Sequence, residues 1–225
     1  DGVNHNMLVL LNNFWIGLKT GGRRQTTDMC EVVNALLYIA PQAALGDAAQ
    51  WFPPVSTVRR YFYARHNARL FESINTVLAV NLREIEGREA SPSVGVIDSQ
   101  SVKTTESSGP HGYVAGKKVK GRKRRIFTDT CGFLVFILVT PLTFRTAVER
   151  SIVGPFLWLR HIFADGGYTG DKLRNALVDM GKWTIELIKR SDTAKGFEVL
   201  PRRWVVERTF AWLGRCRRLA KDWEA

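Results

Sequence analysis

Three acidic residues constrain the fold more than any other feature of this sequence. Asp98 follows the apolar residues 94–97, Asp165 follows the largely apolar residues 161–164, and Glu207 lies in a basic stretch with helical spacing. Apolar runs of this length are typical of buried strands. Carboxylate oxygens are the ligands that Mg²⁺ prefers, and two such ions stabilise both the attacking and the leaving oxygen of a phosphoryl transfer. The pattern predicts two strand ends and a helix that converge on a pair of metal ions.

Residues 1–90 have the spacing of helices rather than strands. Apolar residues recur three and four apart in segments at about 28–40, 56–62 and 69–85. We expect Thr27 or Asp28 to cap the first helix and Ser56 the second, because such side chains accept hydrogen bonds from free helical amides. Prolines and a glycine predict a loop over 41–55. The arginines here favour either a DNA-binding module or a solvated basic face, and both interpretations stay open.

After residue 90 the pattern changes to short strands that alternate with helices. The predicted elements are strand 94–97, hairpin strands 124–128 and 133–140, helix 147–159, strand 161–164, helix 171–180, strand 183–188 and helix 202–220. This is the element order of an RNase H-like fold. We therefore predict an α/β protein, with a helical region at 1–90 and an RNase H-like catalytic domain at 91–225 whose mixed sheet is flanked by helices.

The balance of charge favours a polyanionic partner. The formal net charge is +12, which is typical of proteins that bind nucleic acids or anionic surfaces. The longest apolar run, 133–139, is far shorter than the roughly 18–20 residues that cross a bilayer, so we expect no membrane partner. The three cysteines are far apart and form no Cys-x-x-Cys pair, which favours a reducing cytoplasm. The four histidines show no metal-ligand spacing, so we expect no catalytic zinc. No signal peptide is recognised, and the start at Asp1 predicts a truncated or processed N-terminus.

Basic residues concentrate in the predicted catalytic domain. Residues 117–125 carry seven basic side chains in nine positions. They lead into a strand beside the one with Asp98, where they would line a nucleic-acid channel and contact phosphates. A solvated charge run is the alternative. The predicted DNA-contacting residues are Lys103, Lys117, Lys118, Lys120, Arg122, Lys123, Arg124, Arg125, Arg202, Arg203, Arg208 and Arg218.

The last predicted helix has two different faces. At about 100° per residue, Arg203, Glu207 and Arg218 share one face. The opposite face is expected to pack on the sheet, and its residues are Val205, Trp212 and Cys216. A surface ion pair between Arg203 and Glu207 is the alternative interpretation. The place of Glu207 in the acidic triplet favours a functional role instead.

Four longer motifs contain these residues. They are Val-Ile-Asp-Ser-Gln-Ser-Val-Lys at 96–103, Gly-Lys-Lys-Val-Lys-Gly-Arg-Lys-Arg at 116–124, Phe-Ala-Asp-Gly-Gly-Tyr at 163–168, and Leu-Pro-Arg-Arg-Trp-Val-Val-Glu-Arg-Thr-Phe-Ala-Trp-Leu at 200–213. Together they closely resemble the DDE transposases of bacterial insertion sequences, most of all the insertion-sequence-five family. The resemblance covers residues 20–40 and 53–225, with gaps.

The resemblance implies a metal-dependent reaction on DNA. It implies Asp98, Asp165 and Glu207 as the catalytic, metal-binding triad, with Mg²⁺ or Mn²⁺ and two ions at the site. The reaction would be cleavage at the ends of a mobile element and strand transfer into target DNA. It also implies that Arg203 holds Glu207 or the DNA, that region 1–90 binds DNA ends, and that the chain is a homo-oligomer on double-stranded DNA. The expected location is the bacterial cytoplasm, at the nucleoid.

Several segments depart from the family pattern. Residues 1–19 do not look like the usual N-terminus, 41–52 replace a Thr-Gly-Cys-x-Trp pattern, and 141–154 replace a stretch with an Asp-Arg pair. Val114 stands where members have Asp, and Gly214 where they have a basic residue. Our hypothesis is a drifted or locally frame-shifted copy with an intact triad. Two alternatives to an active transposase stay open: a decayed copy that only binds DNA, and a nuclease on the same fold.

Overall fold

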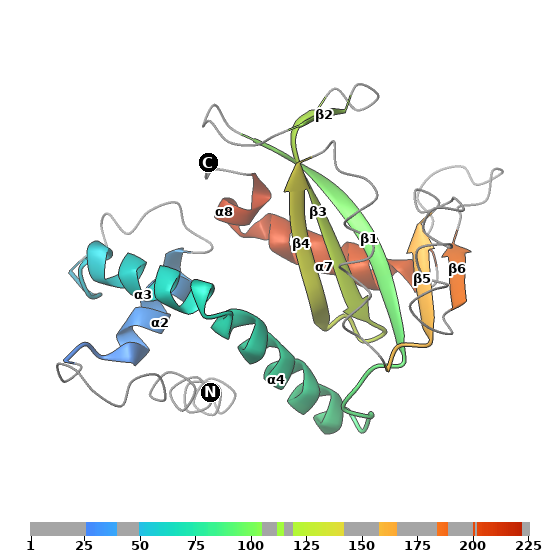
Figure 1. Cartoon of the computed structure of the whole chain (residues 1–225), viewed down its shortest axis with the longest axis horizontal. Coiled ribbons are helices and arrows are strands. Elements are labelled where there is room, and N and C mark those ends of the chain that lie inside the picture. The colour runs from blue at the N-terminus through green and yellow to red at the C-terminus, as the bar shows by residue number, and fades with distance from the viewer. Residues whose placement is uncertain are drawn as a thin grey trace. The chain divides into compact units, whose positions relative to one another are not determined.

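A computed structural model describes residues 26–39, 50–104, 112–114, 119–141, 158–165, 184–188, 200 and 202–221 (Figure 1). The described helices are α2 (Met29–Ile39), α3 (Val55–Asn67), α4 (Leu70–Ile85), α7 (Arg203–Arg215) and α8 (Arg217–Ala220). The described strands are β1 (Val94–Lys103), β2 (Gly112–Val114), β3 (Val119–Asp129), β4 (Leu134–Pro141), β5 (His161–Asp165) and β6 (Thr184–Ile188).

The chain divides into two compact units. One comprises Asp1–Leu78 with Cys216–Arg218, and the other comprises Ala79–Arg215 with Leu219–Ala225. The boundary between the two units falls inside α4, after Leu78, whereas the sequence predicts a boundary at residue 90. The division into 1–90 and 91–225 stays a prediction about function.

The first unit is built from helices, as predicted. Asp28 caps α2, because its Oδ1 accepts a hydrogen bond of 2.8 Å from the amide of Cys30. The predicted cap at Ser56 is wrong: α3 begins at Val55 after Pro54, without a side-chain cap. The helices share an apolar core in which side chains of α2 pack against the N-terminal half of α4. Its buried residues are Met29, Val32, Val33, Leu70 and Ile74.

The second unit contains a mixed sheet. β1 is antiparallel to β3 on one side and parallel to β5 on the other, and β5 is parallel to β6. Both β2 and β4 pair with the far edge of β3. Both hairpin strands therefore lie on one side of β1 and both later strands on the other (Figure 1). This arrangement confirms the predicted α/β class and agrees with an RNase H-like core.

The two faces of the sheet are packed differently because β-strand side chains alternate. Val96 and Ile126 point to the face covered by α7, where they form a buried cluster with Val206 and Phe210. Ile97 points to the opposite face and packs with another cluster, whose buried residues are Phe127, Leu159, Ile162 and Ala164. Asp98 alternates with Ile97 and therefore lies on the α7 face.

The turn between β3 and β4 is fixed by a buried carboxylate. Asp129 has no exposed side-chain surface and pairs with Arg83 from the end of α4. Its Oδ1 also accepts hydrogen bonds of 2.9 Å from the amides of Cys131 and Phe133. Gly132 takes a φ of 94°, a conformation that L side chains rarely adopt. The turn predicted at 129–132 is confirmed, and Asp129 ties it to the helix.

The last helix corrects the sequence prediction. Instead of a continuous helix over 202–220, α7 ends at Arg215 and α8 starts at Arg217. Arg218 lies beyond this break, so it does not share a continuous helical face with Glu207. Trp212 does not pack on the sheet, since 52% of it is exposed, whereas Val205 is buried as predicted. Val206, Thr209 and Phe210 complete the packed face of α7.

Other strands start or end away from their predicted limits. β1 runs to Lys103 rather than stopping at 97, and β3 starts at Val119 rather than 124, because the two pair along Gly95–Lys103. Most of the predicted helices 147–159 and 171–180, and the glycine-rich turn at 166–170, lie outside the described residues.

Candidate active site

The parallel pairing of β1 and β5 brings two of the predicted acids together. Ile97 lies opposite Ala164 in the register, so Asp98 and Asp165 follow at neighbouring positions. Asp165 is the last residue of β5. Both acids are on the face that α7 covers, and α7 carries Glu207. The three acids predicted from the sequence therefore come from two adjacent strands and the helix above them.

One arginine connects all three carboxylates. Arg203 Nη2 lies 3.4 Å from Asp98 Oδ2, and Arg203 Nη1 lies 3.2 Å from Asp165 Oδ1. Arg203 Nη2 is also 3.4 Å from Glu207 Oε1, four residues later on α7. The ion pair between Arg203 and Glu207 is therefore no isolated surface pair. A planar guanidinium with several donors suits this role.

The site holds its negative charge in a partly buried environment. The side chain of Asp98 is 11% exposed, while those of Asp165 and Glu207 are 40% and 43% exposed. Burial raises the pKa of Asp98 above its ordinary value, and the neighbouring Asp165 raises it further; the amide of Ser99 and the guanidinium of Arg203 act in the opposite direction. The fold therefore penalises the charged form of Asp98, and a cation at this site would offset that penalty.

Comparison with known families assigns the domain that carries this site. Residues 89–225 match the family described as "Transposase DDE domain". The chain belongs to this family. The transposase domain includes every strand of the mixed sheet and both acids on its strands. Among the described residues of this chain, no helix is long and apolar enough to cross a membrane.

Two individual proteins are similar to this chain. A putative transposase for insertion sequence element IS402 from Burkholderia cepacia is 33% identical over 111 residues, which cover 44% of this chain and 52% of that protein. The chain thus spans about half the length of this relative. A cryo-EM structure of a piggyBac transposase synaptic complex with hairpin DNA is 14% identical, with a TM-score of 0.42, over 81% of this chain and 47% of that one.

Transposases of this family generally use divalent metal ions. The donor set fits such an ion by its chemistry, because three carboxylates already share one cation. Within the described residues, no three acidic, histidine or cysteine side chains are close enough to hold a metal as they stand. The guanidinium of Arg203 lies between the acids, so joint metal binding requires it to turn away.

The predicted DNA-contacting residues fall into different environments. Lys103 and Lys120 are exposed, and Arg122 and Lys123 are half-buried. Arg124 and Arg125 are buried: Arg124 donates to the carbonyl of Leu219 at 2.5 Å, and Arg125 to the hydroxyl of Thr140 at 2.6 Å. Their charged ends serve the packing of the sheet, so we do not propose DNA contact for these two. Lys117 and Lys118 lie outside the described residues.

The arginines of α7 also have internal roles. Arg208 lies between Trp204 and Trp212, at 4.7 Å and 4.9 Å from their ring centres, and donates to the carbonyl of Cys131 at 2.7 Å. Arg202 lies 5.7 Å from the ring centre of Phe163. Arg218 is half-buried in α8.

One further group of cationic side chains is not predicted by any sequence pattern. Arg83, Arg88 and His161 line a cavity with Arg202. No motif marks these residues, because they come from separate segments that only the fold brings together. Asp129 could have pointed to this region, because it is an acid at the end of a strand, as Asp98 and Asp165 were predicted to be. It pairs with Arg83 and does not join the three acids of the candidate active site.

Proposed function

We propose that this chain is a transposase that cleaves DNA at the ends of an insertion sequence and joins the freed end to target DNA. The observation that carries the proposal is the convergence of Asp98, Asp165 and Glu207 on Arg203 in a domain of the DDE family. The similarity to a putative insertion-sequence transposase supports the same reaction. Membership of the insertion-sequence-five group is part of this proposal.

The proposed metal ligands are Asp98, Asp165 and Glu207, with two Mg²⁺ or Mn²⁺ ions. When bound, such ions polarise the phosphate and activate a water or a 3′-hydroxyl as nucleophile. The chain itself supplies a fixed base for the ligands: Asp98 and Asp165 are held by paired strands, and Glu207 by a helix packed on them. Arg203 balances the carboxylates before the ions bind and is then available to contact DNA.

The proposed DNA path follows the strands beyond Asp98. In the register of β1 with β3, Ser101 lies opposite Lys123, Val102 opposite Arg122 and Lys103 opposite Gly121. Basic side chains thus occur on both strands beyond the acid: Arg122 is on the face of Asp98, whereas Lys103 and Lys123 alternate to the opposite face. Their proposed role is to contact phosphates, which positions DNA without reading its sequence. Region 1–90 is proposed to bind element ends, with the chain acting as a homo-oligomer on DNA at the bacterial nucleoid.

A cleavage and strand-transfer assay tests the proposal. Labelled element-end DNA is incubated with the chain in Mg²⁺ or Mn²⁺ and in EDTA, beside the variants Glu207→Gln and Glu84→Gln. Glu84 is an exposed acid on α4 and serves as the matched control. We expect metal-dependent cut and joined products that are lost only in Glu207→Gln. Cleavage without joining would identify a nuclease, and binding without cleavage a decayed copy.

A further inference from the structure

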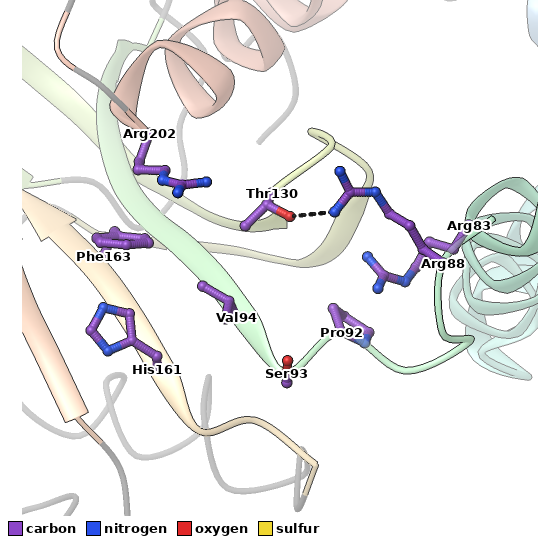
Figure 2. A pocket seen from close by; sticks show the side chains of 9 residues that line it. All are labelled: Arg83, Arg88, Pro92, Ser93, Val94, Thr130, His161, Phe163 and Arg202. Carbon is purple, nitrogen blue, oxygen red and sulfur yellow. Dashed lines mark hydrogen bonds between the residues drawn. The ribbon is translucent and has the colours of Figure 1, made fainter. Parts of the chain in front are cut away.

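A cavity of about 310 Å³ lies at the end of the sheet where β1 and β5 begin. Val94, the first residue of β1, and His161, the first of β5, form its floor together with Phe163 (Figure 2). His161 and Phe163 alternate with Ile162 along β5, and Val94 is paired with His161. All three therefore lie on the face that carries Asp98 and Asp165. The cavity is therefore on the same face as the candidate active site, toward the opposite ends of the strands.

The walls of the cavity are cationic. Arg88 and Arg202 reach it from different segments, with Thr130 between them (Figure 2). Arg83 also lines it, but its charge is balanced by the buried carboxylate of Asp129. None of the described residues that line it is acidic. Within the described part of the chain, neither Arg88 nor Arg202 forms an ion pair with a carboxylate. The exposed Glu186 lies 3.4 Å from His161 Nε2.

Among the described residues, both arginines make weak contacts. Arg88 Nη1 donates to the hydroxyl of Thr130 at 3.3 Å. Arg202 lies over the ring of Phe163 and has a φ of 71°, which is uncommon for a residue with a side chain. This conformation separates Arg202 from Arg203, so that consecutive residues serve the cavity and the acids. Strained backbone of this kind is most often kept where it serves function.

We propose that this cavity binds a phosphate group of the DNA backbone, held between Arg88 and Arg202. Guanidinium groups bind phosphate oxygens through paired, charge-assisted hydrogen bonds, and two of them face one space here. The volume also admits the attached sugar beside the rings of Phe163 and His161. The inference rests on the proposed action on DNA and adds a binding site away from the catalytic acids.

The position of the cavity predicts which phosphate it binds. Val94 and Asp98 are four residues apart on β1, as are His161 and Asp165 on β5, which corresponds to about 13 Å along the strands. Duplex DNA rises 3.4 Å per base step on each strand, so the bound phosphate lies roughly four steps from the cleaved bond. Substrate contacts at this spacing would fix the angle at which DNA enters the active site.

The decisive experiment combines changes in protein and DNA. Element-end duplexes carry one uncharged methylphosphonate at successive positions and are bound, in EDTA, by the parent chain and by the double variant Arg88→Gln/Arg202→Gln. Both side chains are exposed, so the variant should fold, as its melting temperature will verify. Arg215→Gln, an exposed arginine near the end of α7, controls for loss of charge.

We expect one position, about four steps from the cut, where the methylphosphonate weakens binding to the parent and to Arg215→Gln by about tenfold. Binding to the double variant should already be weaker there and should not fall further. The double variant should also lower the salt slope of binding by about 1, as expected for one lost phosphate contact. Equal effects of every methylphosphonate on all proteins would overturn the proposal.

Two further measurements are needed. One distinguishes DNA from free phosphate compounds as the ligand, and the other distinguishes failure of this site from failure of the proposed catalysis. Thymidine 5′-monophosphate and inorganic phosphate are titrated while NMR follows the ring of His161. If either saturates the cavity below millimolar concentration, the ligand is a free phosphate compound, and the DNA assignment is overturned. If the position-specific effect appears in a chain that never cleaves DNA, the site stands while the proposed catalysis fails. If the chain cleaves DNA but shows no position-specific effect, the proposed catalysis stands and the phosphate site is overturned.

Discussion

Two regions of one sheet face, called here the acidic end and the basic end, lie four residues apart along β1 and β5 and carry opposite charge, although the consecutive residues Arg202 and Arg203 contribute to both. At one end, Arg203 lies among Asp98, Asp165 and Glu207, and the carboxylates outnumber the cation. At the other end, Arg88 and Arg202 line a cavity without acidic residues. The acidic end suits metal cations, and the basic end suits phosphate. Charge on this face therefore changes sign along the strands.

This arrangement suits a single DNA strand that passes both ends. A phosphodiester would be repelled by the unneutralised acids and attracted by the arginines. Metal ions at the acidic end would remove that repulsion and supply the chemistry. Productive binding therefore requires attraction by the arginines at the basic end and metal ions at the acidic end. Substitutions can alter the two ends one at a time.

The largest expected effect comes from removing a carboxylate at the acidic end. Glu207→Gln or Asp165→Asn should reduce cleavage by about 10³-fold or more, because a lost ligand removes several kcal/mol of transition-state stabilisation. DNA binding in EDTA should be retained, since no positive charge is lost. Cleavage rates and filter-binding affinities measure the two effects. A parallel loss of both would contradict the separation of the acidic end from DNA binding.

The next effect concerns the stability of the basic end. Asp129→Ala leaves Arg83 as a buried charge without its partner and removes the acceptor of two turn amides. Breaking a buried pair in this way costs about 3–5 kcal/mol of the free energy of unfolding. Urea denaturation measures it, with Glu84→Ala on exposed α4 surface as a control expected to stay within about 0.5 kcal/mol. A cost below that of an exposed pair would show that the turn is held by other contacts.

A smaller effect is expected from the cation at the acidic end. Arg203→Gln removes the charge shared by the three acids, so the variant should melt below the parent in EDTA. Divalent ions should then bind about tenfold more tightly, because they no longer displace a guanidinium. The rise of the melting temperature with Mg²⁺ concentration reports this affinity through linkage. The same rise in Arg203→Gln and in the parent would mean that Arg203 does not compete with metal.

The sequence predicted the acidic end well and the basic end poorly, for a physical reason. Asp98 and Asp165 each follow an apolar run, and they become neighbours because the parallel strands pair in the register Ile97 with Ala164. The cavity depends on Arg88, Thr130 and His161, which come from a linker, a turn and a strand start. Their meeting depends on the turn held by Asp129 and Arg83, residues 46 positions apart. No local pattern encodes such a contact.

Patterns of charge and periodicity also gave wrong predictions for residues whose environment depends on tertiary contacts. Arg124 and Arg125 belong to a charge run that normally faces solvent, but a central strand buries both and supplies acceptors from Leu219 and Thr140. Trp212 lies on the edge of the apolar stripe of α7, and Arg208 stacks on it outside the core. In both cases the deciding partner lies elsewhere in the chain or on the outer helix surface. The charge run therefore gave the wrong environment for the two arginines, and helical spacing gave the wrong environment for Trp212.

The smallest expected effect is a change in the free energy of unfolding when the charge of Asp98 is removed. Its pKa is raised by burial and by Asp165, so the folded state favours the neutral acid. This contribution to stability is complete below the ordinary pKa of 3.8 and is lost as the pH rises through the raised pKa of the folded state. Asp98→Asn keeps the shape without the charge and should avoid that loss. The variant should therefore be more stable than the parent at pH 7, by less than Asp129→Ala destabilises.

The pH dependence makes this test specific. The stability difference between Asp98→Asn and the parent should shrink as the pH falls below 3.8, where both side chains are neutral. Urea denaturation at pH 7 and pH 3.5, in EDTA, measures the difference, and the exposed Glu84→Gln should show no comparable change. Adding Mg²⁺ at pH 7 should stabilise only the parent and narrow the gap. If the gap is constant with pH, or if Mg²⁺ stabilises both proteins equally, the carboxylate of Asp98 does not carry a charge penalty that a metal relieves.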